Sequence, residues 1–308
     1  MAITAAMVKE LREATGAGMM DCKKALNETN GDMEKAVEFL REKGLAAMAK
    51  KANRIAAEGI VAVKACDCGK AASIVEVNSE TDFVAKNADF QAYVAKVAAQ
   101  ALDTKADTIE AFMAEPWAED TSLTVEQALS QKIAVIGEKL SIRRFQKVSV
   151  DNGVVCTYIH AGGKIGVVVA LETECDNEAV KECGKNVAMQ IAALNPKYVD
   201  RSEVPADFIE HEKEILKVAA RNENPDKPEN IIDKMIIGRL NKELKEVCLV
   251  DQAYVKDGDL TVQKYVDSVA KEVGAAIKVK SFVRFETGEG MEKREDDFAA
   301  EVAKQAGM

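Results

Sequence analysis

The chain has 308 residues, of which 47% are hydrophobic and 31% charged, and its formal net charge is −10. Such a length predicts about two globular domains, and the acidic balance argues against a protein that mainly neutralises nucleic-acid phosphates. No uncharged apolar run approaches the roughly 20 residues that span a bilayer, and the N-terminal pattern is helical rather than that of a signal peptide. We therefore expect a cytoplasmic protein with no membrane contact and no direct nucleic-acid binding.

Residues 1–55 carry the pattern of three short helices. Thr4 and Asp32 are placed to cap the first and third helices, and Gly44 is placed to end the third. The small, basic run at 50–58 predicts a linker. Because three short helices make a marginal core, we expect this module to be tethered to the rest of the chain rather than tightly docked.

Met19 and Met20 in the second of these helices allow two interpretations. Methionine in a small helical unit usually packs in the core. Adjacent helical residues point about 100° apart, so one of the pair could be exposed, and an exposed methionine is an adaptable binding surface.

From residue 59 the sequence repeats itself at a constant offset of 94 residues, with no gap. The aligned pairs include Gly59 and Gly153, Gly69 and Gly163, Lys70 and Lys164, and Asp82 and Asp176. Each copy has the pattern of a strand, a Gly-Lys turn, a second strand, an acidic junction and a helix. This predicts an α+β fold with a duplicated β-hairpin/helix core, divided into subdomains at 56–150 and 151–285.

The ends of the two copies repeat at a different offset. Ser-x-x-Arg-Phe occurs at 141–145 and again at 281–285, an offset of 140. The second copy must therefore hold 46 extra residues (140 less 94). Residues 205–222 and 231–247 have helical patterns separated by a proline-rich turn. They predict a helical hairpin at about 205–250, which either lies flat on its own domain or presents its outer face to a partner.

Two further segments have simple expectations. The acidic run 114–120 holds the only tryptophan, Trp117, and predicts a surface loop. Residues 286–308 predict a C-terminal helical module, with a charged helix from about 291 to 305 that needs something to pack on.

The seven cysteines form no regular framework. Cys66 and Cys68 are close together but lack a second pair, which argues against a structural zinc site. We expect reduced thiols, as in a cytosol-like compartment.

No motif for catalysis is present. Gly162-Gly163-Lys164 lacks the spacing and the hydroxyl of a phosphate-binding loop. Of the two histidines, His211 is expected on a helix surface, and His160 at a hairpin tip is either merely exposed or a contact residue. The sequence therefore predicts no catalytic residue, no metal site and no cofactor.

Residues 80–87 lie where a strand is followed by a helix. Phe83 there either packs under the helix as core or projects as an anchor for a partner. In the gap-free alignment Asp82 matches Asp176, whereas Phe83 faces Asn177. The aromatic ring thus belongs to one copy only, which favours the second interpretation.

The run Thr-Asp-Phe-Val-Ala-Lys-Asn at 81–87 closely resembles the bacterial elongation factor Ts family. The similarity extends over nearly the whole chain, through residues 11–26, 159–167, 227–231 and 284–290. The resemblance implies a non-enzymatic nucleotide exchange factor, active in translation elongation, that binds the GDP form of elongation factor Tu and promotes GDP release. It implies that Thr81, Asp82, Phe83 and Val84 disturb the Mg²⁺ and phosphate site of this GTPase.

The resemblance implies further contacts as well. Ile136 and Gly137 match a contact beside the Phe83 wedge, His160 matches a contact to another region of the GTPase, and Met19 and Met20 lie on the docking face of the N-terminal module. That module is implied to be similar to a ubiquitin-associated (UBA) fold, and the helical hairpin to be a coiled coil that supports dimerisation in some members.

Two hypotheses from other classes remain open from the residues alone. One is a small-molecule enzyme with its site between the repeats, around Asp82 and Asp176. The other is an adapter whose residues 1–55 bind ubiquitin-like surfaces.

Overall fold

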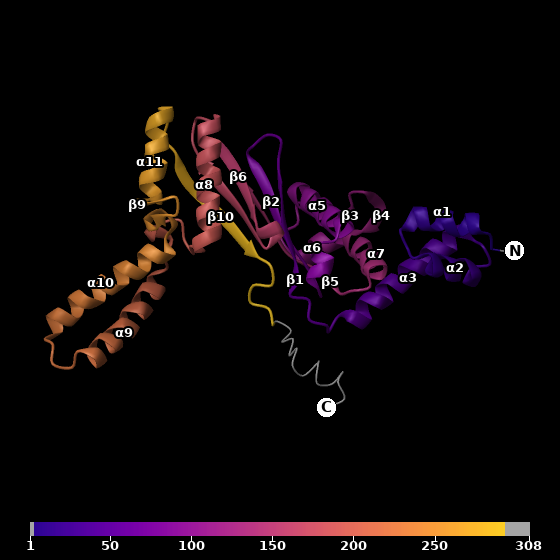
Figure 1. The fold of residues 1–308 in the computed structure, drawn as a ribbon, viewed down its shortest axis with the longest axis horizontal. Coiled ribbons are helices and arrows are strands. Elements are labelled where there is room, and N and C mark those ends of the chain that lie inside the picture. Colours follow the sequence, from indigo (N-terminus) through magenta and orange to yellow (C-terminus); the bar gives the residue numbers. More distant parts are fainter. Residues whose placement is uncertain (1–2, 293–308) are drawn as a thin grey trace.

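The computed structural model describes residues 3–292, and its centre is a pair of three-stranded antiparallel sheets (Figure 1). The first sheet has the order β1-β2-β5 and the second the order β10-β7-β6. The strands are β1 (Glu58–Ala65), β2 (Ala71–Ser79), β5 (Leu140–Ser149), β6 (Gly153–His160), β7 (Ile165–Glu172) and β10 (Lys278–Glu286). The expectation of an α+β fold is confirmed.

The two sheets share an apolar core of mostly β-branched side chains, which suit a pleated surface. The approach is close, because a Cβ added at Gly166 would lie 2.5 Å from Cγ1 of Val61. The buried residues of this core are Val61, Ala72, Ile74, Val148, Val150, Val155, Val168, Ala170, Val283 and Phe285.

Helices cover the outer face of each sheet. On the first lie α5 (Ala88–Asp103), α6 (Ile109–Ala114) and α7 (Val125–Ile136), and on the second α8 (Glu178–Leu194) and α11 (Val262–Val273). Each half therefore has a helix-on-sheet core of its own, and the inter-sheet core joins the two halves.

The acidic run around Trp117 is not a loop. It forms the short hairpin β3 (Pro116–Trp117) and β4 (Asp120–Thr124), and Trp117 is buried against Tyr93 with ring centroids 5.8 Å apart. Gln100 holds the hairpin: its Nε2 donates to the Pro116 carbonyl at 2.9 Å, and its Oε1 accepts from the Ala118 N–H at 3.0 Å. The loop was predicted because this run is rich in acidic residues, but the ring of Trp117 is buried while most of the carboxylates around it lie at the surface.

The second half repeats this clamp. Gln190 donates to the Ala253 carbonyl at 3.0 Å and accepts from the Val255 N–H at 2.8 Å, and so holds β8 (Ala253–Tyr254) with β9 (Asp257–Thr261). Asn87 and Asn177 likewise cap α5 and α8. The two members of each pair are 90 residues apart. The gap-free alignment with an offset of 94 residues is therefore wrong beyond the second strand of each copy.

The four residues of difference form the short helix α4 (Asp82–Ala85), which the second half lacks. The offset of 140 also needs correction. Phe145 lies opposite Val75 and Phe282 lies opposite Val169, so these two phenylalanines are counterparts, 137 residues apart. The sequence match had followed Arg-Phe pairs that occupy different positions along the two edge strands.

The N-terminal module consists of α1 (Ala5–Thr15), α2 (Met19–Glu28) and α3 (Met33–Lys51) around a small core that includes Leu11, Cys22 and Leu26. The third helix does not end at Gly44. An added Cβ there would lie 3.2 Å from the Ser130 carbonyl of α7, so this glycine allows close helix packing instead of a stop. The module is therefore docked through α3, and the expectation of a mere tether is wrong. Of the expected linker at 50–58, α3 includes Lys50 and Lys51 and β1 includes Glu58, so residues 52–57 connect the two elements.

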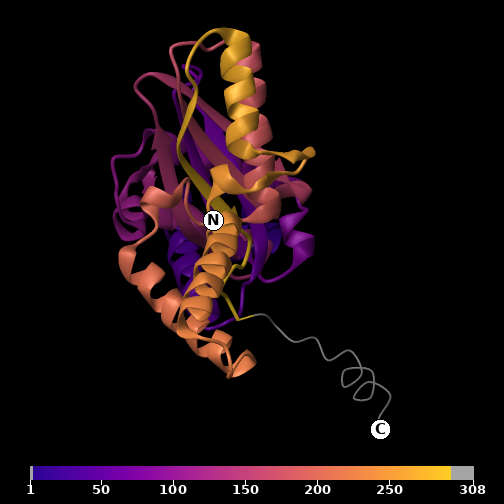
Figure 2. The same cartoon turned by 90° about the vertical axis from the view of Figure 1, so that its left-hand side faces the viewer.

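The inserted segment is a helical hairpin of α9 (Ala206–Glu223) and α10 (Glu229–Val247), as expected. It extends away from the sheets in both views (Figures 1 and 2). Its apolar residues pack between the two helices and with its base, as Leu216, Ile236 and Tyr198 do, so it does not lie flat on its own domain. The expected C-terminal helix falls largely on residues 293–308, outside the described residues.

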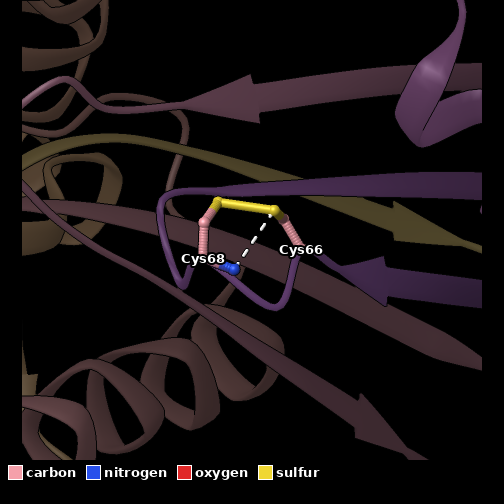
Figure 3. The surroundings of a disulfide bond; sticks show 2 residues. All are labelled: Cys66 and Cys68. Carbon is pink, nitrogen blue, oxygen red and sulfur yellow. Dashed lines mark hydrogen bonds between the residues drawn. A yellow bond between two sulfur atoms is a disulfide. The ribbon is translucent and has the colours of Figure 1, made fainter.

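Three single turns of 3₁₀ helix complete the described elements: η1 (Ala161–Gly163), η2 (Arg201–Glu203) and η3 (Leu249–Asp251). At the tip of β1 and β2, Cys66 and Cys68 are joined by a disulfide (Figure 3). The expectation of reduced thiols is wrong for this pair, because the tight turn brings the two sulfurs together.

Candidate protein-binding site

The turn α4 is anchored on one side and open on the other. Thr81, in an extended conformation, caps it by accepting the Val84 N–H on its side-chain oxygen at 3.4 Å. Ala85 is buried in the core of the first half and Val84 packs against that core, whereas Phe83 is 81% exposed. The interpretation of Phe83 as a core residue is therefore wrong, because its side chain stays in solvent while its neighbours Val84 and Ala85 contact the core.

Glu138 holds this turn against the end of α7. Its carboxylate accepts hydrogen bonds from the Glu80 N–H at 3.1 Å, the Thr81 N–H at 3.0 Å and the Thr81 hydroxyl at 2.7 Å. Gly137, in the left-handed conformation with φ +84°, ends α7 just before it, next to half-buried Ile136. The structure thus brings the predicted residues Ile136 and Gly137 together with α4, through a residue that the sequence analysis missed.

No sequence pattern marks Glu138 out, since a carboxylate after a helix-ending glycine is an ordinary surface residue. The importance of Glu138 depends on its hydrogen-bond partner Glu80, which lies 58 residues earlier in the chain. A second link supports the corner, because Arg54 pairs with the Glu80 carboxylate at 3.2 Å.

Charges surround the base of Phe83. Asp82 pairs with Lys86 at 2.6 Å, and this hydrogen bond holds the pKa of Asp82 below its ordinary value and raises the pKa of Lys86. Lys164 adds a smaller lowering effect on the pKa of Asp82, and itself pairs with Glu58 at 2.6 Å. The exposed ring therefore projects from a rim of paired charges, the arrangement expected of a solvated contact residue.

His160 lies at the end of β6, exposed, with its Nδ1 3.0 Å from the Tyr158 hydroxyl. The adjoining turn packs on the start of β1, because an added Cβ at Gly163 would lie 3.0 Å from Cβ of Ile60. The turn α4 follows β2, whose end pairs with the start of β1 through Ser79 and Glu58. The β6–β7 tip and α4 thus lie by the same end of β1.

Met19 and Met20 lie apart from this group. Both are exposed, at 59% and 74%, so the core interpretation is wrong for the pair. They line a groove together with Val8, Arg12 and Lys23, between α2 and the segment that runs from Ile3 into α1. His211 is exposed on α9, as expected.

Within residues 3–292 no cluster of three or more His, Cys, Asp and Glu side chains is placed to hold a metal ion. Across the same part of the chain, none of the helices combines the length and the apolar character needed to cross a membrane.

An exposed aromatic ring on an anchored turn and a pair of exposed methionines define a protein that binds another protein. A family model described as Elongation factor TS matches residues 80–289. Relatives named Elongation factor Ts come from Clostridioides difficile (59% identical, covering 98% of both chains), Clostridium tetani (56%, covering 98% and 99%) and Clostridium botulinum strain Eklund 17B (55%, covering 99% of both). The chain belongs to the elongation factor Ts family, which implies a nucleotide exchange factor for elongation factor Tu rather than an enzyme.

Proposed function

We propose that this chain releases GDP from elongation factor Tu by inserting Phe83 beside the Mg²⁺ and phosphate site of the GTPase. The observation that carries this proposal is the 81% exposure of a phenylalanine whose turn is anchored at Thr81 and Ala85. Because the backbone of this turn is already ordered, binding has to fix only the side chain of Phe83, which costs less conformational entropy than ordering a flexible loop.

Exchange requires negative coupling between two ligands of the GTPase. The factor weakens GDP binding by the same ratio by which GDP weakens binding of the factor. It must therefore prefer a state of the GTPase in which GDP is poorly held. The bound Mg²⁺ is the largest local charge in such a site, so displacing the segment beside it gives the greatest effect.

The other residues around the turn have supporting roles in the proposal. Thr81 and Val84 fix the conformation of α4, and Asp82 presents a carboxylate at its start. Ile136 and Gly137, joined to the turn through Glu138, extend the same contact. His160 meets a second region of the GTPase, and the exposed pair Met19 and Met20 docks the N-terminal module.

The finer features of the family complete the proposal. The three-helix module at 1–55 is a UBA-like fold, and the body consists of the subdomains 56–150 and 151–285. The hairpin of α9 and α10 is a coiled coil whose exposed Ile215, Val218 and Ile237 support dimerisation. The factor acts in the cytoplasm without direct contact to nucleic acid.

The test is release of fluorescent GDP from elongation factor Tu. Phe83→Ala is expected to slow factor-stimulated release roughly 30-fold, the effect of removing one hot-spot residue. Val255→Ala is the matched control, because Val255 is an exposed apolar residue of the second half. Wild-type factor that leaves the release rate unchanged would disprove the exchange function. A Phe83→Ala variant as active as wild type would disprove the wedge while sparing that function.

A further inference from the structure

The tip of the β1–β2 hairpin carries the disulfide between Cys66 and Cys68 (Figure 3). Cys68 is exposed and Cys66 half-buried, so solution reagents can reach the bond. The tip lies at the opposite end of the hairpin from α4, because Ala65 pairs with Ala72 there while Glu58 pairs with Ser79 beside α4. It is separate from the surface proposed for nucleotide exchange.

This disulfide adds little to the stability of the fold. A cross-link stabilises mainly by restricting the unfolded chain, and the effect falls as the closed loop shortens. Here a single residue separates the cysteines. The turn is already held by hydrogen bonds from the Cys66 N–H to the Ala71 carbonyl at 2.8 Å and from the Gly69 N–H to the Cys66 carbonyl at 2.9 Å.

The five other cysteines differ from this pair. Cys22, Cys156, Cys183 and Cys248 are buried, and Cys175 is half-buried. Burial raises the pKa of Cys156 and of Cys248 to about 11, so little of the reactive thiolate forms there at neutral pH. Exchange with thiols in solution therefore concentrates on the hairpin tip.

We propose that Cys66 and Cys68 form a redox-active pair that exchanges with small dithiols and disulfides. An accessible disulfide without a structural task belongs to the labile class, in contrast to buried structural bonds. The pair is also asymmetric. The Cys68 N–H donates to Sγ of Cys66 at 3.2 Å, whereas Cys68 is the more exposed residue of the two. The N–H stabilises a thiolate on Cys66, which makes Cys66 the leaving group and Cys68 the atom attacked.

The reaction is a two-electron exchange. One thiolate of a small dithiol attacks Sγ of Cys68, the bond to Cys66 breaks, and its electron pair stays on Cys66 as thiolate. The second sulfur of the dithiol then attacks the mixed disulfide and releases Cys68. The dithiol is oxidised to a cyclic disulfide, and its two protons end on the two cysteines. In the reverse direction a small disulfide such as oxidised glutathione reoxidises the pair and leaves as two thiols.

The test is alkylation of the native full-length chain by iodoacetamide, with the labelled positions mapped by mass spectrometry. After excess dithiothreitol, Cys66 and Cys68 should both be labelled, and after oxidised glutathione neither should be. Cys175→Ser is the matched control and should leave this difference of two labels intact. A pair that stays labelled after oxidised glutathione, or that resists dithiothreitol until denaturant is added, would overturn the proposal.

The asymmetry has its own test, because reduced glutathione leaves a mixed disulfide on the sulfur that it attacks. The oxidised chain is treated briefly with reduced glutathione, quenched in acid and mapped by mass spectrometry, and more glutathione should be found on Cys68 than on Cys66. Equal amounts, or the reverse order, would exclude Cys68 as the attacked sulfur.

Discussion

The two strand-to-helix junctions of this molecule share their flanking residues but differ in length. In both halves the second strand is followed by a glutamate, Glu80 or Glu174, and the helix begins at a capping asparagine, Asn87 or Asn177. The first half inserts the four residues of α4 between these points, whereas the second half continues directly. The shared residues build the fold, and the inserted ones carry the exposed ring.

The support for the insertion is also confined to one half. The helices α7 and α11 both end at a glycine in the left-handed conformation, Gly137 and Gly274. The next residue is Glu138 in the first half, where it accepts three hydrogen bonds from the α4 region, and Ala275 in the second. One copy of the duplicated scaffold thus has both an extra turn and the residue that anchors it, at neighbouring points of the structure.

The largest expected effect comes from making the two junctions equal. Deleting Asp82–Ala85 gives the first junction the length of the second, so the chain should fold while stimulated GDP release from elongation factor Tu is lost. Circular dichroism and the release assay measure the two outcomes. As a matched control, the same four residues inserted between Cys175 and Asp176 should leave release unchanged. A deletion variant that still stimulates release would break the comparison.

Removing the anchor should have an intermediate effect. Glu138→Ala leaves the Glu80 N–H, the Thr81 N–H and the Thr81 hydroxyl without this acceptor. Hydrogen bonds to a charged group are worth about 1.5–3 kcal/mol each, so we expect a loss of about 2 kcal/mol in unfolding free energy after solvent partly replaces them. Urea denaturation measures this loss, and the release rate should fall as well. Ala275→Gly, at the equivalent position, should leave release at the wild-type rate.

The shared glutamines should affect stability alone. Gln100→Ala and Gln190→Ala each leave a hairpin carbonyl and an N–H without their partner, at a cost of about 1–3 kcal/mol. The effect should be greater for Gln190, which is fully buried and also contacts Gln252. Chemical denaturation of both variants tests the order. A larger loss for Gln100→Ala than for Gln190→Ala would contradict this order.

The smallest effect is expected at Asp82. Its pKa is lowered by the hydrogen bond from Lys86, so the contribution of this pair is present above the ordinary carboxyl value of 3.8 and is lost as pH falls through the lowered pKa. Both side chains are solvated, so Asp82→Asn should change the melting temperature only slightly at pH 7 and not at all below the lowered pKa. Melting curves over this range would contradict the assignment if the difference grew on acidification.

Much of the architecture could be predicted from local signals. Capping residues such as Thr4 and Asp32 act within one turn of helix, and both cap as expected. The duplication and the helical hairpin follow from periodicity and from proline positions in the same way. The residues around Phe83 were found through the run at 81–87, although their contacts with the GTPase remain a proposal.

The sequence by itself determined the α+β class, the repeated hairpin-and-helix units and the family, because these depend on patterns within short stretches of chain. Only the tertiary structure decided that Gly44 is a packing site, that Trp117 is buried, and that the copies differ by four residues at α4. The physical reason is that each depends on a partner far away in the chain: Ser130 for Gly44, Gln100 for the Trp117 hairpin, and Glu138 for α4.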